Sequence, residues 1–420
     1  MIFKVQNLGY IEEAEVDLSK DLIIFTGQNN TGKTYLAYAI YGLLNHQYSK
    51  IDLDLKDIQY DKNFIKVKYE IVLSKYKKSI KNDVKNLRQF IGEVFSSSNL
   101  FFDNTRFDVA FRDSDFLKMN PNKKFEYTLQ IHEPSLTFEE SKLGLEFNLN
   151  YDIIKRLFQR TYIAPAERNA VNIFSKELSL TKNKLFKNRN GNGLIKDAQF
   201  VNRYPKPVQD NLEIAEDLAF LSKNKSDFEY LAIELEQDFL KGKISTNQYG
   251  QIEYTPDNQK DINLEIHLTA SMVKSLSNIV FYLRHLAQKG DCIIIDEPEL
   301  NLHPDNQRKI ARFIGRLINE GFQVVISTHS DYIIKELNNM IMLSKAKENQ
   351  ELVKKLGFRG DELVNPEQVQ ALLFTLESRK PSTIEVTEEG FSVKTIDETI
   401  AKQDALTEEI YYQLFEQEPV

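Results

Sequence analysis

A glycine-rich segment near the start of the chain has the residue types and spacing that bind phosphate. Its residues, in order, are Gly27, Gln28, Asn29, Asn30, Thr31, Gly32, Lys33 and Thr34. The glycines let the backbone turn so that N–H groups point at phosphate oxygens, and a helix that begins here adds a favourable partial charge. In this pattern, the P-loop, the lysine reaches the β and γ phosphates and the threonine hydroxyl binds Mg²⁺. We therefore predict that these residues, with Tyr35 directly after them, bind ATP and Mg²⁺.

A second group of candidate residues is the acidic pair Asp296 and Glu297, which follows the apolar run Cys292–Ile295. Two acids after an apolar run are a weak signal alone, because many strands end at a solvated turn. In a chain that also carries a P-loop, they are typical of a Walker B element. Asp296 is predicted to hold the Mg²⁺ shell through water, and Glu297 to polarise the water that attacks the γ-phosphate.

A third apolar run, Gln323–Ser327, leads into a polar stretch that contains His329. A histidine at the end of a strand is more often structural, but it can also contact a γ-phosphate and sense its loss. Ligands of α/β folds bind at the carboxyl edge of the parallel strands. If the three apolar runs are neighbouring strands, their polar ends meet at that edge. Lys33, Glu297 and His329 are then the predicted catalytic residues.

The elements that must position these groups follow from hydrophobic periodicity. Buried strands are predicted at Leu22–Phe25, Cys292–Ile295, Gln323–Ser327 and Met340–Leu343. Further strands are predicted at Ile2–Val5 and Glu13–Leu18 as a hairpin, at 63–75, Phe125–Ile131 and Leu143–Leu149, and as a second hairpin at Lys243–Leu268. Residues Thr161–Arg168 are predicted to be a strand that runs into a loop. Helices are predicted at Tyr35–Leu44, 77–98, 151–160, Pro207–Leu240, Ala270–Ala287, Asp305–Asn319, from Tyr332 and at Ile396–Phe415. Buried strands that alternate with helices imply a mostly parallel sheet covered on both faces.

Composition narrows the class of protein. The 420 residues are 41% hydrophobic and 28% charged, as in a soluble globular protein. One cysteine, Cys292, fits a reducing compartment and a buried strand. The first residues resemble a strand rather than a signal peptide, and no apolar run is long enough to span a bilayer, so we expect a cytoplasmic protein without membrane contact. A net charge of -8 does not favour nucleic-acid binding over the whole surface, although a local basic face is compatible with it.

We predict four regions along the chain. Residues 1–170 form an amino-terminal ATPase lobe with the P-loop and a β subdomain, and 171–242 form a basic loop, within 181–206, followed by a helical insertion. Residues 243–345 form a second ATPase lobe with the Walker B element and the switch histidine. Residues 346–420 form an acidic carboxyl-terminal extension.

The order of these motifs resembles that of the ABC-type ATPases of the SMC, Rad50, RecF and OLD group. The segment Asp296–Pro304, which reads Asp-Glu-Pro-Glu-Leu-Asn-Leu-His-Pro, is particularly similar to prokaryotic AAA family ATPases of that group, and Tyr162–Arg168 resembles a segment recurring in them. The resemblance covers residues 1–45, 160–170 and 265–345. It implies an ABC-ATPase head: a mixed, mostly parallel sheet flanked by helices, with an antiparallel β lobe and a helical insertion.

In that family ATP lies between two heads, which implies at least a homodimer. The family's signature motif should precede the helix before Walker B, where this chain has Leu268–Ser275 without the usual glycines. Ser271 either caps that helix and directs it at a γ-phosphate across a dimer, or is an ordinary N-cap. Arg168 either meets a phosphate or a neighbouring subunit, or forms a structural salt bridge. Tyr10 is a candidate for packing near the base.

Segments that relatives carry are missing here. The interval between the motifs is too short for the long coiled coil of SMC proteins, and we find no acidic cluster for a nuclease. ATPase subunits of this kind occur in anti-phage defence systems similar to Septu and PARIS, where they hold a separate effector nuclease or toxin, and slow, regulatory hydrolysis is expected. The alternative is a RecF-like ATPase that binds duplex DNA through the basic stretches 62–88 and 182–206. A nucleotide-gated scaffold is a third possibility.

Overall fold

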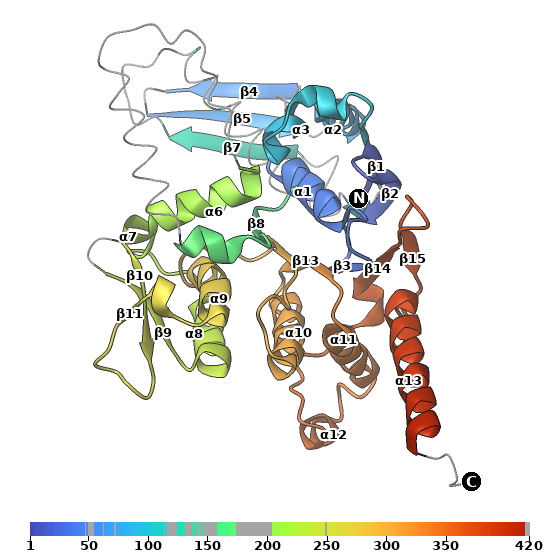
Figure 1. Cartoon of the computed structure of the whole chain (residues 1–420). Coiled ribbons are helices and arrows are strands. Elements are labelled where there is room, and N and C mark those ends of the chain that lie inside the picture. Colours follow the sequence, from blue (N-terminus) through green and yellow to red (C-terminus); the bar gives the residue numbers. More distant parts are fainter. Residues whose placement is uncertain are drawn as a thin grey trace, which may run out of the picture.

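The computed structural model of the chain is built around a six-stranded sheet with the order β15-β14-β3-β13-β12-β8 (Figure 1). The strands are β3 (Leu22–Gly27), β8 (Thr161–Ala164), β12 (Cys292–Asp296), β13 (Gln323–Thr328), β14 (Val369–Phe374) and β15 (Ser382–Ile384). All neighbours are parallel except β15, which pairs antiparallel with β14. The described residues are 1–46, 48, 54–61, 63–70, 73–112, 114–115, 124–130, 137, 139, 142, 145, 158–173, 204–247 and 250–415.

Alternate residues of the central strands pack into two separate cores. On β3, Ile23 and Phe25 belong to the core that contains α1 (Lys33–Leu44). Leu22 and Ile24 belong to the core that contains α9 (Ser271–Phe281), α10 (Pro304–Asn319) and α11 (Asp331–Ser344). The same alternation holds on β12 and β13. Successive side chains of a strand point to opposite faces, so a strand covered on both sides must be apolar throughout. The predicted α/β fold, with a mostly parallel sheet covered on both faces, is confirmed.

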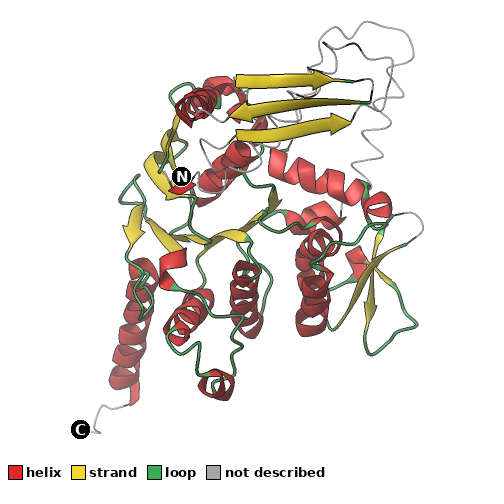
Figure 2. Ribbon diagram, turned by 180° about the vertical axis from the view of Figure 1, so that it is seen from behind, coloured by secondary structure: helices red, strands yellow, loops and turns green. Residues whose placement is uncertain are grey.

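Antiparallel sheets and short helices cover the first face. The predicted hairpin is present as β1 (Ile2–Leu8) and β2 (Ile11–Asp17), and β6 (Arg106–Ala110) pairs with β1. A second sheet has the order β4-β5-β7, and it lies at the end of the molecule far from the carboxyl-terminal helix (Figure 2). Its strands, and the helices that follow, are β4 (Asp54–Tyr60), β5 (Phe64–Glu70), β7 (Lys124–Gln130), α2 (Leu73–Asn86) and α3 (Arg88–Phe95).

Helices cover the second face. They are α8 (Glu229–Leu235), α9 (Ser271–Phe281), α10 (Pro304–Asn319) and α11 (Asp331–Ser344), with the short α12 (Gln350–Lys355) beyond them. The region predicted as helical from Pro207 to Leu240 is helical but divided, because α6 (Lys206–Glu216) and α7 (Leu218–Leu221) precede α8. The hairpin predicted after it is a three-stranded sheet of β9 (Gly242–Thr246), β10 (Ile252–Pro256) and β11 (Leu264–Glu265).

The carboxyl-terminal region differs from the prediction. Met340–Leu343 is not a strand, because α11 continues through it to Ser344. Short apolar runs fit a buried helix as well as a strand, and here Met340 and Ile341 face the core from the helix. The next parallel strand is β14, within the acidic region, and it pairs with β3. The boundary at residue 345 stays a prediction, but the central sheet extends beyond it.

The chain ends in a single long helix, α13 (Lys394–Phe415), as predicted. The predicted strand Leu143–Leu149, the predicted helix 151–160 and the basic loop 181–206 lie wholly or largely outside the described residues. No helix in the described part of the chain is long and apolar enough to cross a bilayer.

Candidate nucleotide-binding site

The P-loop follows β3 directly and has a backbone that glycine makes possible. Gly27 and Gly32 have φ of 119° and 100°, which L-residues with a Cβ rarely adopt. A Cβ at position 32 would also lie 2.7 Å from the side chain of Ile11 in the adjoining hairpin. Helix α1 begins at the next residue, so its free N–H groups point into the loop. The loop therefore has the form of an anion site at a helix amino terminus.

Lys33 is buried and lies over the loop. Its Nζ donates to the carbonyl oxygens of Gly27 at 3.0 Å and Gln28 at 2.6 Å. Burial lowers the pKa of Lys33, and the negative charges of Glu297, Asp296 and Glu299 oppose this shift. Those charges act on Lys33 only because the end of β12 lies near the P-loop. The structure thus brings the first two predicted motifs together.

Thr34 and Asp296 meet directly, although they come from distant parts of the sequence. The Thr34 hydroxyl donates to Asp296 Oδ2 at 2.9 Å, and the Ser327 hydroxyl donates to Oδ1 of the same carboxylate. Burial raises the pKa of Asp296, whereas these two hydrogen bonds lower it. A hydroxyl and a carboxylate are hard oxygen donors, so this pair fits Mg²⁺. These are the two residues predicted as its ligands.

Glu297 is half-buried, and its backbone N–H and carbonyl are both hydrogen-bonded. Its N–H donates to the carbonyl oxygen and the hydroxyl of Ser327, each at 3.1 Å. Its φ of 51° places a non-glycine residue in the left-handed region, which is uncommon and marks a constrained backbone. This constrained backbone, at the carboxyl edge of the sheet, consequently limits the positions that the Glu297 carboxylate can occupy.

His329 lies one residue beyond β13, beside a buried carboxylate that the sequence did not single out. Its side chain is 46% exposed, and its Nδ1 lies 3.4 Å from Glu299 Oε1. Glu299 also accepts the His329 N–H at 2.9 Å and the Thr328 hydroxyl at 2.9 and 3.0 Å. Burial raises the pKa of Glu299, and these hydrogen bonds act against that rise. Glu299 therefore orients the switch histidine.

Arg168 does not lie where a phosphate could reach it, which corrects the expectation of a phosphate contact. It is 1% exposed, and its donors face inward. Nε donates to the Ser275 hydroxyl at 2.8 Å, and the remaining nitrogens donate to the carbonyl oxygens of Pro165, Asp296 and Glu297. A hydroxyl and backbone carbonyls carry no net charge. The acceptors of these four hydrogen bonds are therefore neutral, instead of the carboxylate that a structural salt bridge requires.

Two further predicted residues lie at the periphery of the site. Ser271 is the first residue of α9 and is exposed, but the N-cap position is Ala270, whose backbone is extended, so the predicted capping role is wrong. The Tyr35 ring stacks on Phe95 with centroids 4.9 Å apart, and a Cβ on Gly9 would lie 2.9 Å from that ring. Tyr35 therefore fixes α1 against the hairpin.

The carboxyl-terminal region contributes residues that sequence reasoning missed. The Gln28 N–H donates to the Phe374 carbonyl at 3.0 Å, and Gln28 Oε1 accepts the Leu376 N–H at 2.8 Å. The Tyr10 hydroxyl donates to the Leu376 carbonyl at 2.7 Å, so Tyr10 is tied to this segment instead of standing free for a base. The alternating apolar residues of β14 were the signal that could have revealed this strand.

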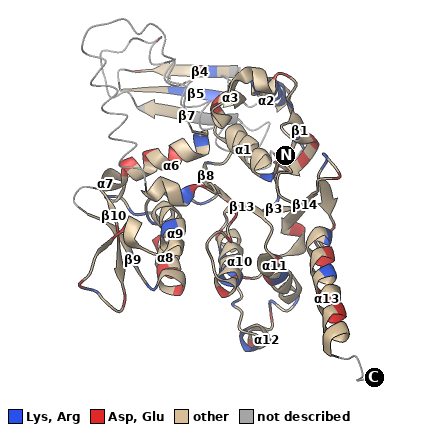
Figure 3. Cartoon of the chain, in the orientation of Figure 1, with Lys and Arg blue, Asp and Glu red and all other residues tan. Residues whose placement is uncertain are grey.

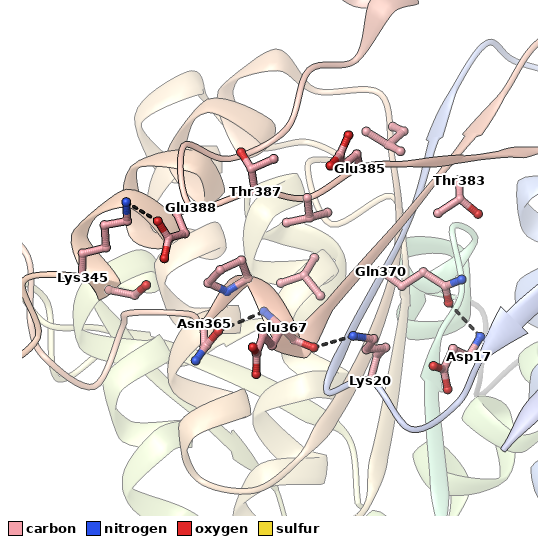
Figure 4. A pocket seen from close by; sticks show the side chains of 15 residues that line it. Asp17, Lys20, Lys345, Asn365, Glu367, Gln370, Thr383, Glu385, Thr387 and Glu388 are labelled. Atoms are coloured by element: carbon pink, nitrogen blue, oxygen red, sulfur yellow. Dashed lines mark hydrogen bonds and ion pairs between the residues drawn. The ribbon is translucent and has the colours of Figure 1, made fainter. Parts of the chain in front are cut away.

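A separate hollow of about 690 Å³ lies at the amino ends of β3 and β14, away from the P-loop (Figure 4). Several side chains that line this hollow form ion pairs or hydrogen bonds with other lining residues. Lys345 forms an ion pair with Glu388, Lys20 donates to the Glu367 carbonyl, and Gln370 accepts the Asp17 N–H at 2.8 Å. We assign no chemistry to this hollow.

Comparisons with known proteins agree with the site. A family model described as "AAA ATPase domain" matches residues 1–334. The energy-coupling factor transporter ATP-binding protein EcfA of Carboxydothermus hydrogenoformans is 35% identical over 60 residues, which are 14% of this chain and 22% of that protein. The chain thus matches about a fifth of that relative's length, 22%.

Similar solved structures include SMC head domains. That of Thermotoga maritima is 8% identical with a TM-score of 0.33, covering 92% of this chain and 98% of that one. The Smc head domain with an extended coiled coil, bound to the carboxyl-terminal domain of ScpA derived from Pyrococcus furiosus, is 10% identical with a TM-score of 0.35, covering 96% of this chain and 98% of that one.

Proposed function

The chain belongs to the AAA ATPase domain family, and on that premise we propose that it is an ATPase of the ABC and SMC type that hydrolyses ATP between two copies of itself to control a separate effector. The observation that carries the ATPase assignment is the meeting of the P-loop with the ends of β12 and β13. There Thr34 donates to Asp296, and Lys33 lies within the field of three carboxylates.

Each residue at this edge has a distinct task. Lys33 and the loop N–H groups bind the β and γ phosphates. Thr34 and Asp296 would hold Mg²⁺, which would neutralise charge on the phosphate oxygens when bound. Glu297 accepts a proton from the attacking water. His329, held by Glu299, contacts the γ-phosphate. ATP is therefore the substrate, and ADP and phosphate are the products.

Variants of Lys33 and Glu297 test this assignment. Lys33→Ala removes the phosphate cation and is expected to abolish ATP binding, measured by titration with a fluorescent ATP analogue. Glu297→Gln keeps the shape of the side chain but cannot take a proton, so it should bind ATP and release phosphate far more slowly. If Glu297→Gln leaves phosphate release unchanged, Glu297 is not the base, and the nucleotide-gated scaffold becomes the better interpretation.

A dimer would complete the site from the second copy. Ser271 lies exposed at the start of α9, the helix that occupies the signature position. The helix amino terminus of one copy could then face the γ-phosphate held by the other. We expect the Glu297→Gln protein to dimerise or multimerise when ATP is added. The mass of the assembly with and without ATP measures this, and a monomer under both conditions contradicts it.

We further propose that the effector is a nuclease or toxin of an anti-phage defence system, and that it docks on α13. This helix has 22 residues and none of them is buried. Both acidic and basic residues lie along it (Figure 3). Acidic side chains alternate there with large exposed apolar residues, namely Leu406, Ile410, Tyr411, Tyr412, Leu414 and Phe415. Exposed apolar residues on one helix are typical of a partner surface. Co-purification from the native operon tests this, and a protein that stays alone without an adjacent effector gene contradicts it.

A second candidate function is duplex-DNA binding by a RecF-like ATPase. It is favoured by a hollow of about 380 Å³ on α2, lined by Lys77, Lys78, Lys81, Asn82, Lys85 and Phe111. Arg88 and Arg106 line an adjoining hollow with Lys85. Such a surface would contact phosphates without reading sequence. ATP-dependent binding that weakens steeply with salt supports this candidate, and no binding at low salt excludes it.

A further inference from the structure

The buried Arg168 lies between two parts of the site and contacts both. One is the turn at Glu297, which carries the proposed base. The other is α9, whose exposed start occupies the signature position. The guanidinium donates to Glu297 O at 2.7 Å and Asp296 O at 2.7 Å on one side, and to Ser275 Oγ at 2.8 Å on the other. One side chain thus joins the base to the helix.

The segment that carries Arg168 is fastened to α9 at a second point. Asn172 Nδ2 donates to the carbonyl oxygen of Lys274 at 2.5 Å, next to Ser275 in the helix. Both contacts lie about one turn from Ser271, the exposed first residue of the helix. A shift of α9 along or across its axis would therefore pull on this segment at adjacent residues, because a helix moves as a nearly rigid body.

The other end of the link acts on a constrained residue. Glu297 has φ of 51°, its N–H is held by Ser327 on β13, and its carbonyl is held by Arg168. The N–H and the carbonyl of Glu297 belong to the two peptide units on either side of its Cα, so holding both limits φ and ψ of Glu297 and with them the direction in which its side chain leaves the backbone. The position of the guanidinium consequently influences where the carboxylate points.

We propose that Arg168 is a positioning residue that couples α9 to the backbone of Glu297. When α9 of one copy settles against ATP held by the other, Ser275 moves with the helix and Arg168 sets the Glu297 carboxylate for hydrolysis. The inference rests on the proposed ATP-bound dimer. It adds the route by which contact between the two copies reaches Glu297. Arg168 is buried and its hydrogen bonds go to protein acceptors, so it acts through Glu297.

The chain offers a matched pair of serines for the test. Ser275 and Ser277 are both buried in α9, but the Ser277 hydroxyl donates to Val273 O at 2.5 Å within its own helix. Ser275→Ala cuts the link to Arg168, whereas Ser277→Ala removes a hydroxyl of the same kind from the same helix. ATP affinity, and the hydrolysis rate per protomer as protein concentration rises through the dimerisation range, are measured for both and for the wild type.

The wild type should hydrolyse faster per protomer as dimers form, and Ser277→Ala should match it. Ser275→Ala should bind ATP with the same affinity and form the same dimer, but lose about tenfold in dimer kcat, the size of effect that follows from loss of a hydrogen bond to a charged group. Arg168→Lys keeps the buried cation without reaching both sides, so it should show the same split, with kcat lowered and KM unchanged.

Each alternative result has a clear meaning. If Ser275→Ala and Ser277→Ala have equal dimer rates while the wild type depends on concentration, the coupling is wrong and the dimer stands. If the wild-type rate per protomer is independent of concentration, the ATP-bound dimer itself is wrong. If Arg168→Lys lowers ATP affinity and thermal stability without a separate loss of dimer kcat, Arg168 is only structural, and the inference is overturned.

Discussion

Gly27 and Phe374 lie so close that a Cβ at position 27 would sit 2.0 Å from the Phe374 carbonyl oxygen. The same carbonyl accepts the N–H of Gln28 at 3.0 Å. The last residues of β3 and β14 thus meet at the start of the P-loop, and β14 supplies part of the loop's support. Strand β14, which follows Asp296, Glu297 and His329 in the sequence, consequently lies directly beside the P-loop.

Two truncations should separate the roles of the carboxyl-terminal elements. Deletion of residues 394–420 removes α13, none of whose residues is buried, so ATP binding and the unfolding temperature should be nearly unchanged. Deletion of 369–420 also removes β14 and exposes the edge of β3, with its unpaired backbone groups. That protein should be insoluble or unable to bind ATP. Soluble yield, circular dichroism and ATP titration measure the difference, and equal behaviour of both truncations contradicts it.

Removal of the Thr34 hydroxyl should raise the Mg²⁺ requirement. Thr34→Ala loses the donor to Asp296 Oδ2 and one predicted metal ligand, so hydrolysis at limiting Mg²⁺ should fall by about 10- to 100-fold, the usual range for groups around a metal. Thr34→Ser keeps the hydroxyl and serves as the control. The measurement is phosphate release against Mg²⁺ concentration at saturating ATP. A Thr34→Ala curve that overlays the Thr34→Ser curve removes Thr34 from the metal site.

Burial should decide how much two ion pairs contribute to stability. Arg284 and Glu236 are 2.6 Å apart, and both are almost fully buried. Arg284→Leu leaves a buried carboxylate unpaired and should lower the free energy of unfolding by about 3–5 kcal/mol. Lys225 also forms an ion pair, with Glu229 at 3.0 Å, but it is 70% exposed, so Lys225→Leu should cost less than about 1 kcal/mol. Urea unfolding compares the variants, and similar losses contradict the argument.

The sequence revealed those residues of the candidate site that lie at the carboxyl ends of buried strands. Lys33, Asp296 and His329 each follow an apolar run, and parallel strands bring such ends to one edge, so their meeting was predictable. The role of Arg168 was not, because its acceptors are backbone carbonyls 128 and 129 residues away, which leave no pattern in the side chains. Strand β14 was missed because its apolar residues stand within an acidic region, and its partner β3 lies near the other end of the chain.

Glu299 should give the nucleotide-free protein a measurable dependence of stability on pH. Burial raises the pKa of this carboxyl above that in the unfolded chain, whose reference value is about 4.3. The folded state then binds a proton that the unfolded state has released, so the stabilisation is complete below the unfolded pKa and is lost as pH rises through the folded pKa. Glu299→Gln removes this titration, and its unfolding temperature should fall less than that of the wild type as pH rises toward neutral.

The control for this comparison is Glu377→Gln, which neutralises an exposed glutamate. It should follow the wild-type dependence of unfolding temperature on pH, because the substitution leaves the buried Glu299 in place. The same Glu299→Gln protein should retain ATP binding but hydrolyse more slowly, since the Nδ1 of His329 loses a charged acceptor 3.4 Å away. Nitrogen shifts of the imidazole should then show less of the Nδ1-protonated tautomer. An unchanged tautomer, or a pH dependence equal to that of the wild type, would show that Glu299 does not orient His329 as a buried carboxylate.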